Sequence, residues 1–167
     1  NKVKLLGELL VELGIVTPEQ LAHAQGAARE EGLSLARVLV REGLVLSRDM
    51  AALMALHLGF PMVDLRSQAI DPDAVAAVPE HIARRYPVLP LKTEEGRLTV
   101  AMTDPMDFRL IQDLAALTGS SIQPVIATAE DILEHIDVSY RLMESSGEGA
   151  SDASTASAGD KVTARQL

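Results

Sequence analysis

The sequence predicts an α+β fold in which a helical tandem repeat packs with a small strand–strand–helix–strand–helix subdomain. Three observations lead to this prediction. Residues 5–59 contain one helical unit written twice, residues 88–140 alternate short apolar strands with helical patterns, and residues 144–167 show no hydrophobic periodicity. We therefore divide the chain into a helical tandem-repeat subdomain (1–60), a small α+β subdomain (61–143) and a flexible tail or linker (144–167).

The repeat becomes visible when one copy is shifted by 29 positions, so that Gly14 falls on Gly43. The other matching positions include Leu6 with Leu35, Leu10 with Leu39, and Val16 with Val45. A period of this length indicates a duplicated supersecondary unit, and two copies are too few for a solenoid. We therefore expect a pseudo-symmetric pair of helical hairpins.

Each copy carries the start and stop signals of two helices. Leucines at helical spacing predict a short first helix with a buried apolar face. Gly14 and Gly43 end that helix, because glycine adopts the left-handed conformation without a steric cost. In the first copy Thr17 is the expected cap of the second helix, with Gln20 in the capping-box position. In the second copy Ser47 is the expected cap.

After residue 60 the sequence alternates turn signals with short apolar runs. The expected elements are helices opening at Asp71 and Pro79, strands 88–91 and 97–102, a helix 106–117, a strand 122–126 and a helix from Thr128. Pro90 has no N–H to donate, which favours a sheet edge for the first strand, and Pro124 interrupts the third. The acids beside proline at the helix starts are interpreted as caps rather than as catalytic pairs; they are Asp71, Asp73, Asp104 and Asp107.

Composition argues against several classes of function. The net charge of −9 and the 2% aromatic content disfavour nucleic-acid binding, which needs cations and stacking platforms. The chain has no cysteine, hence no disulfide or thiolate metal site, and its four histidines lack ligand spacing. No run of about 18 apolar residues is present, so no membrane insertion is expected. The absence of any Gly-Lys pair excludes a phosphate-binding loop, and we therefore expect no catalysis by this chain.

Several motifs match one known family. Leu6, Gly7, Leu10 and Gly14 of the first copy, and Leu35, Leu39 and Gly43 of the second, fit a repeat that runs R-L-G-x-x-L-x-x-x-G-x-I-x-x-x-x-L. Further matches are PMVDL, IDPDAVAAVPEHIARRYPVLPL and RLTVAMTDPMD. Over residues 5–140 the chain resembles the N-terminal domain of the ATPases that power type II secretion and type IV pilus assembly.

The resemblance implies a non-catalytic recruitment or regulatory module. Such a module would dock the motor to the cytoplasmic domain of an inner-membrane platform protein, so we expect a cytoplasmic location, peripheral to the bacterial inner membrane through that partner. The ATPase domain would lie outside this chain, in a parent protein compatible with a hexamer formed by its motor domain. The chain begins with Asn1 rather than Met, which is consistent with a piece of a longer protein.

The resemblance also implies a possible ligand, because some members of the family bind cyclic di-GMP on the tandem repeat. The apolar frame of such a trough is present here; it consists of Leu6, Gly7, Leu10, Gly14, Leu35, Leu39 and Gly43. The polar contacts are missing, since Leu5 and Ser34 replace the leading arginines, and Ala28 and His57 replace the terminal glutamines. We expect weak or no binding unless Gln25 or Arg37 substitutes. The alternatives to recruitment are therefore a cyclic di-GMP sensor with a degenerate site, or a signalling adaptor that borrowed the module.

Overall fold

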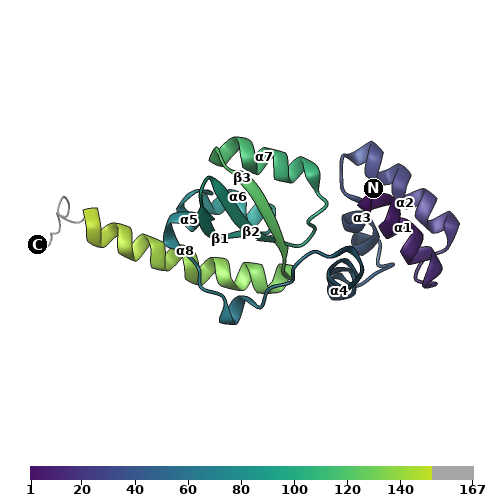
Figure 1. Cartoon of the computed structure of the whole chain (residues 1–167), viewed down its shortest axis with the longest axis horizontal. Helices are drawn as coiled ribbons and strands as arrows, with labels where there is room; N and C mark the ends of the chain where they lie inside the picture. The colour runs from purple at the N-terminus through teal and green to yellow at the C-terminus, as the bar shows by residue number, and fades with distance from the viewer. Residues whose placement is uncertain (152–167) are drawn as a thin grey trace, which may run out of the picture.

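The computed structural model describes the backbone of residues 1–151 and the side chains of residues 1–144. Within that range it shows helices together with one three-stranded sheet, which confirms the predicted α+β class. In Figure 1 the helices of the tandem repeat form one end of the molecule, and the sheet with its covering helices forms the middle. The last helix runs out from the opposite end.

The tandem repeat folds as helices α1 (Lys2–Glu12), α2 (Pro18–Glu31), α3 (Leu35–Arg41) and α4 (Ser47–Leu58). Gly14 and Gly43 follow the first helix of each copy with φ of +74° and +78°, which confirms the predicted left-handed stops. The predicted capping box is also present. Thr17 Oγ1 accepts the Gln20 N–H at 3.0 Å, and Gln20 Oε1 accepts the Thr17 N–H at 2.9 Å.

Two helix starts differ from the sequence prediction. Helix α1 begins at Lys2, ahead of the expected first apolar turn, because the Asn1 side chain accepts the N–H groups of Val3 and Lys4. The prediction that Ser47 caps α4 is wrong. Ser47 is already helical, and the cap position is occupied by Leu46, whose side chain has no hydrogen-bonding atom.

The second half of the described chain contains the sheet. Its elements are a 3₁₀ turn η1 (Leu65–Ser67), α5 (Pro72–Ala76), α6 (Glu80–Arg85), β1 (Val88–Glu94), β2 (Arg97–Met102), α7 (Phe108–Thr118), β3 (Ser121–Ile126) and α8 (Ala129–Ser151). The strand order is β1-β2-β3, with β1 antiparallel and β3 parallel to β2. Glu95 and Gly96, both at positive φ, form the hairpin turn between β1 and β2. Helix α7 supplies the crossover to β3.

Both outer strands carry a proline, and Pro90 lies at a sheet edge as predicted. The prediction that Pro124 interrupts the third strand is wrong, because β3 pairs with β2 without a break from Ser121 to Ile126. The chain between α4 and η1 runs along the end of β3, where the Ile126 N–H donates to the Pro61 carbonyl at 2.8 Å and the Val63 N–H donates to the Ile126 carbonyl at 3.0 Å. In Figure 1, α7 and α8 lie on opposite sides of the sheet. Tyr140 fastens α8 by donating its hydroxyl to the Val78 carbonyl at 2.7 Å.

Buried apolar side chains form two clusters, one under the sheet helices and one inside the tandem repeat. Met106 and Ile126 lie in the cluster of the repeat, although both follow residue 60 in the chain. The proposed division at residue 60 stays a prediction. Helix α8 continues to Ser151, past the point where the flexible tail was expected to begin, and residues 152–167 lie outside the described range.

Replacing Gly43 with valine is expected to destabilise the fold by about 1–2 kcal/mol, the cost of a left-handed backbone for a residue with a Cβ. A Cβ at Gly43 would meet no atom within 4 Å, so the loss comes from the backbone conformation and not from a clash. Chemical denaturation of both proteins measures the difference in the free energy of unfolding.

Gly26→Val is the matched control. Gly26 lies inside α2, has no positive φ and also has open space where a Cβ would be added. Valine there should be neutral or stabilising by about 0.5 kcal/mol, because glycine is the poorer helix former. Equal losses for the two variants would contradict the assigned role of Gly43.

Candidate functional site

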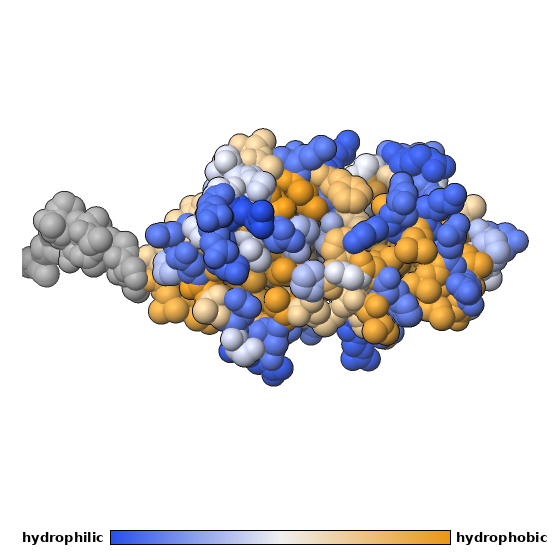
Figure 2. Space-filling view, in the orientation of Figure 1, coloured by the Kyte–Doolittle hydropathy of each residue, from blue (hydrophilic) through white to orange (hydrophobic). Residues whose placement is uncertain are grey.

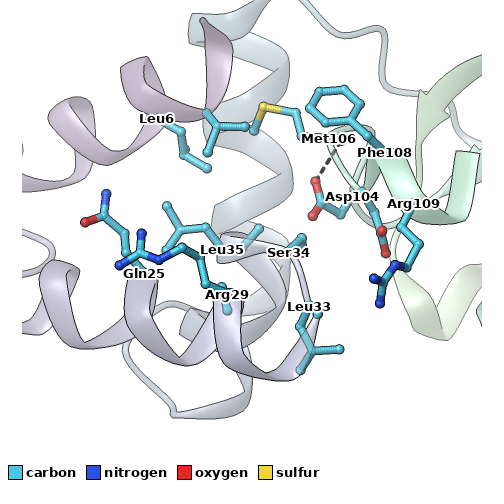
Figure 3. A pocket seen from close by; sticks show the side chains of 15 residues that line it. Leu6, Gln25, Arg29, Leu33, Ser34, Leu35, Asp104, Met106, Phe108 and Arg109 are labelled. Atoms are coloured by element: carbon cyan, nitrogen blue, oxygen red, sulfur yellow. Dashed lines mark hydrogen bonds between the residues drawn. The ribbon is translucent and has the colours of Figure 1, made fainter.

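The clearest cavity in the described structure lies where the tandem repeat meets the sheet subdomain (Figure 3). Its volume is about 380 Å³, which is in the size range of small-molecule sites. One wall comes from α1, α2 and the start of α3, and the other from the loop that precedes α7 together with that helix's first turn. The cavity therefore exists only because the two halves of the chain are packed together.

The walls of this junction cavity combine cations with apolar groups. Arg29 on the last turn of α2 and Arg109 on the first turn of α7 line opposite sides in Figure 3. The lining also includes Leu6, Leu35 and the half-exposed ring of Phe108. Arg109 also packs directly over Gly32, where a Cβ would collide with its guanidinium group. Glycine at position 32 thus leaves room for the Arg109 side chain in this orientation.

Asp104 is the one buried carboxylate of the cavity. It follows β2 at a turn, is only 8% exposed, and its Oδ1 accepts the Met106 N–H at 2.9 Å. Its second oxygen, Oδ2, is buried without a hydrogen-bond partner. Burial raises the pKa of the Asp104 carboxyl, opposed by the nearby Ser34 hydroxyl and the Met106 amide. An unpartnered buried carboxylate costs free energy, so the site favours any group that donates a hydrogen bond to it.

A second, smaller cavity of about 280 Å³ lies on the other side of Asp104. It shares Ser34 and Asp104 with the first and is further lined by Arg37, Arg41 and Tyr86. The Arg41 guanidinium is paired with the Glu31 carboxylate at 2.6 Å, whereas no salt bridge of Arg37 is seen among the described side chains. Ser34 and Asp104 therefore separate two hollows, each with arginine in its wall.

This arrangement suits the binding of a ligand with phosphate groups and a flat ring. Arginines on the walls match phosphate groups, apolar surfaces match a flat ring, and the carboxylate of Asp104 accepts from ring N–H groups. No group of His, Cys, Asp and Glu in the described part of the chain is arranged to hold a metal ion. None of the helices described is long and apolar enough to cross a membrane.

The structure places the predicted trough residues in different settings. Leu6 and Leu35 line the junction cavity, whereas Leu10 and Leu39 are fully buried in the core of the repeat. Gly7 is buried against Leu21, and Gly14 and Gly43 are exposed at helix ends. The seven residues thus do not share one surface. Of the two suggested substitutes, Gln25 lines the junction cavity and Arg37 lines the second cavity.

Sequence reasoning missed four residues of this site, namely Arg29, Asp104, Phe108 and Arg109. Asp107 caps α7 as predicted by accepting the Leu110 N–H. Asp71 likewise caps α5 as predicted. The prediction that Asp104 is a helix cap is wrong, because Asp104 accepts the Met106 N–H in the turn that precedes the helix. What the sequence does not reveal is that Asp104 keeps one oxygen free and faces Ser34. Asp104 and Ser34 are 70 positions apart in the sequence, and no local sequence pattern predicts that they lie close together.

Comparison with known proteins places the chain in a family. The model of the MshEN domain matches residues 58–146, more than half of the chain. This chain belongs to the MshEN domain family. The match confirms the resemblance to the N-terminal domains of secretion and pilus ATPases that the motifs predicted.

Relatives of this MshEN chain include the type IV pilus assembly ATPase PilB of Myxococcus xanthus, 31% identical over 135 residues, 81% of this chain and 24% of that protein. Bacteriophage adsorption protein B of Escherichia coli K12 is 30% identical over 133 residues, 80% of this chain and 18% of that protein. A solved structure of MshE with cdg, an abbreviation of cyclic di-GMP, is 32% identical with a TM-score of 0.61. It covers 81% of this chain and 98% of that one. The MshEN chain thus spans at most about a quarter of these full-length relatives.

Proposed function

We propose that this chain is a non-catalytic recruitment module of a type II secretion or type IV pilus assembly ATPase. In this role it docks the motor to the cytoplasmic domain of an inner-membrane platform protein, from the cytoplasmic side. The observation that carries the proposal is that this chain is similar to a segment of PilB and contains no phosphate-binding loop. Exposed leucines on the tandem repeat supply an apolar surface for such docking; they are Leu5, Leu13, Leu46 and Leu56.

Deleting residues 145–167 is expected to leave docking intact, because the proposed apolar surface lies on the tandem repeat. The measurement is calorimetric titration of the full chain and of residues 1–144 with the purified cytoplasmic domain of the platform protein encoded beside the parent protein. The two affinities should agree within about twofold, or about 0.4 kcal/mol. Binding that is lost only on deletion would move the docking site to the C-terminal segment.

A second candidate function is cyclic di-GMP sensing, favoured by the junction cavity and by the related MshE structure with that ligand. Guanine presents two adjacent N–H donors on one edge, which suit the unpartnered oxygen of Asp104. The ligand's phosphates would find cations in Arg29 and Arg109. The chain nevertheless lacks arginine at positions 5 and 34, so we rank sensing below recruitment.

A further inference from the structure

The tandem repeat departs from its own pseudo-symmetry on the outer face of α4. The exposed face of α4 carries leucine where the same shift of 29 positions puts smaller or polar residues in α2. Leu46 replaces Thr17, Leu53 replaces Ala24 and Leu56 replaces Ala27; between them, Asp49 replaces Gln20. Leu46 is 57% exposed and Leu56 is 78% exposed, whereas Leu53 is half-buried against the core of the repeat.

The change at the start of α4 also removes a stabilising interaction. Thr17 caps α2 with its hydroxyl, whereas Leu46 at the equivalent position makes no capping hydrogen bond. Loss of such a cap is unfavourable for the helix. A leucine that is more than half exposed and replaces a cap contributes little to the isolated fold, which points to a contact outside the fold.

The leucines form one wall of a groove of about 420 Å³. The opposite wall comes from the two corners of the repeat, through Ile15 of the first and Leu44 of the second. Residues 46, 49, 53 and 56 follow the alternating three- and four-residue spacing of a coiled-coil seam. The other face of α4 is buried in the core through Met50, Met54 and Leu58. Figure 2 shows apolar side chains gathered among hydrophilic ones at this end of the molecule.

The charges around the groove indicate which kind of partner it binds. Asp49 stands within the stripe, and the neighbouring hollow that shares Leu44 contains Glu19 and Glu42 together with His23. An anionic lipid surface is disfavoured beside these acids. A second copy of the chain, itself at −9, would bring like charges together. Cytoplasmic segments of inner-membrane proteins, in contrast, carry an excess of lysine and arginine close to their membrane spans.

We propose that the groove formed by Leu46, Leu53 and Leu56 with Ile15 and Leu44 binds an amphipathic helix from a cytoplasmic segment of an inner-membrane protein. The apolar stripe of that helix lies on α4, and a lysine or arginine pairs with Asp49. This inference rests on the proposed recruitment function and specifies its surface and the chemistry of its partner. The stretch from residue 46 to residue 56 is about 15 Å long, which matches about three turns of a partner helix.

The test is titration of the full chain and its variants with the cytoplasmic domain of the platform protein encoded beside the parent protein. Leu46→Ser and Leu56→Ser should each weaken binding by about tenfold or more, since apolar contacts at the centre of an interface dominate affinity. Leu142→Ser is the matched control, because Leu142 is 62% exposed on α8, away from the groove. Leu56→Ser and Leu142→Ser should keep the thermal stability of the native chain, because these leucines are exposed. Leu46→Ser should raise that stability slightly, because serine supplies the side-chain cap that α4 lacks.

Charge reversal tests the chemistry of the partner. Asp49→Lys should weaken binding by about tenfold, and Asp113→Lys, at an exposed acid of α7, should not. If the native chain binds and none of the groove variants differs from its control, the groove assignment is overturned while recruitment stands. If the native chain does not bind the platform domain, recruitment and groove both fail. A concentration-dependent dimer in sedimentation experiments that Leu56→Ser abolishes would overturn the basic partner in favour of a second copy.

Discussion

Arginine at positions 5 and 34 is expected to raise the affinity of this chain for cyclic di-GMP by about two to four orders of magnitude. Each arginine adds a charge-assisted contact worth about 1.5–3 kcal/mol, and every 1.4 kcal/mol changes affinity about tenfold. Ser34 lines both cavities beside Asp104, so Ser34→Arg places its guanidinium directly at the site. Leu5 is 48% exposed on α1 and does not line either cavity, so the larger share of the gain should come from Ser34→Arg.

Calorimetric titration of the native chain, both single variants and the double variant measures this effect. The native chain should bind weakly or not at all. Leu13→Arg with Leu142→Arg adds the same charge at two exposed leucines outside the cavities, and this control should leave affinity unchanged. A native chain with micromolar or tighter affinity would promote the sensor function. A double variant no better than the control would show that the repeat has no cyclic di-GMP surface.

Asp104→Asn is expected to stabilise the fold at pH 7 by about 1–3 kcal/mol, because the neutral amide removes a buried charge whose loss of hydration is unfavourable. Asparagine keeps an oxygen for the Met106 N–H and removes the buried charge next to the unpartnered position. The pKa of Asp104 is raised by burial, so the folded state binds its proton more tightly than the unfolded state. That contribution to stability is fully present below the unfolded pKa, about 3.9, and is lost as pH rises through the folded pKa.

The difference between Asp104→Asn and the native chain should therefore grow from pH 4 to neutral pH. Thermal melts across that range measure it. Asp107→Asn is the matched control, since the side chain of Asp107 caps α7 and asparagine caps as well as aspartate. Its stability should stay within about 0.5 kcal/mol of the native chain. Equal stability of Asp104→Asn and the native chain at pH 7 would mean that the carboxyl is not an unfavourable buried charge.

Features determined by neighbouring residues could be predicted from the sequence. The Thr17–Gln20 capping box, the left-handed Gly43 and the edge position of the strand with Pro90 all depend on a few adjacent positions. The prediction of a cap at Ser47 was wrong, because the cap position of α4 is occupied by Leu46, whose side chain cannot accept a hydrogen bond. A helix cap contributes only about 1 kcal/mol to stability, so a surface contact made by another residue at the same position can contribute more.

The candidate site depends on packing between distant parts of the chain and was only partly predictable. The leucine frame was recognised, but the sequence did not reveal that Leu10 and Leu39 are buried on all sides while Leu6 and Leu35 reach a cavity. Helical periodicity identifies an apolar face and not which of its members meets a hollow. The free oxygen of Asp104 is likewise a property of the tertiary structure, since the local turn involves only its Oδ1 and the Met106 N–H.

Met106 and Ile126 have a consequence for how the halves of the molecule behave. Both side chains come from the sheet half of the chain and are buried in the core of the tandem repeat. The backbone hydrogen bonds that join Pro61 and Val63 to Ile126 hold the connecting segment against the same strand. Separating the halves would expose these two apolar side chains to water, so the hydrophobic effect favours the packed arrangement. A load applied to helices α1–α4 would therefore reach the sheet through this small apolar contact and through the segment that is hydrogen-bonded to β3.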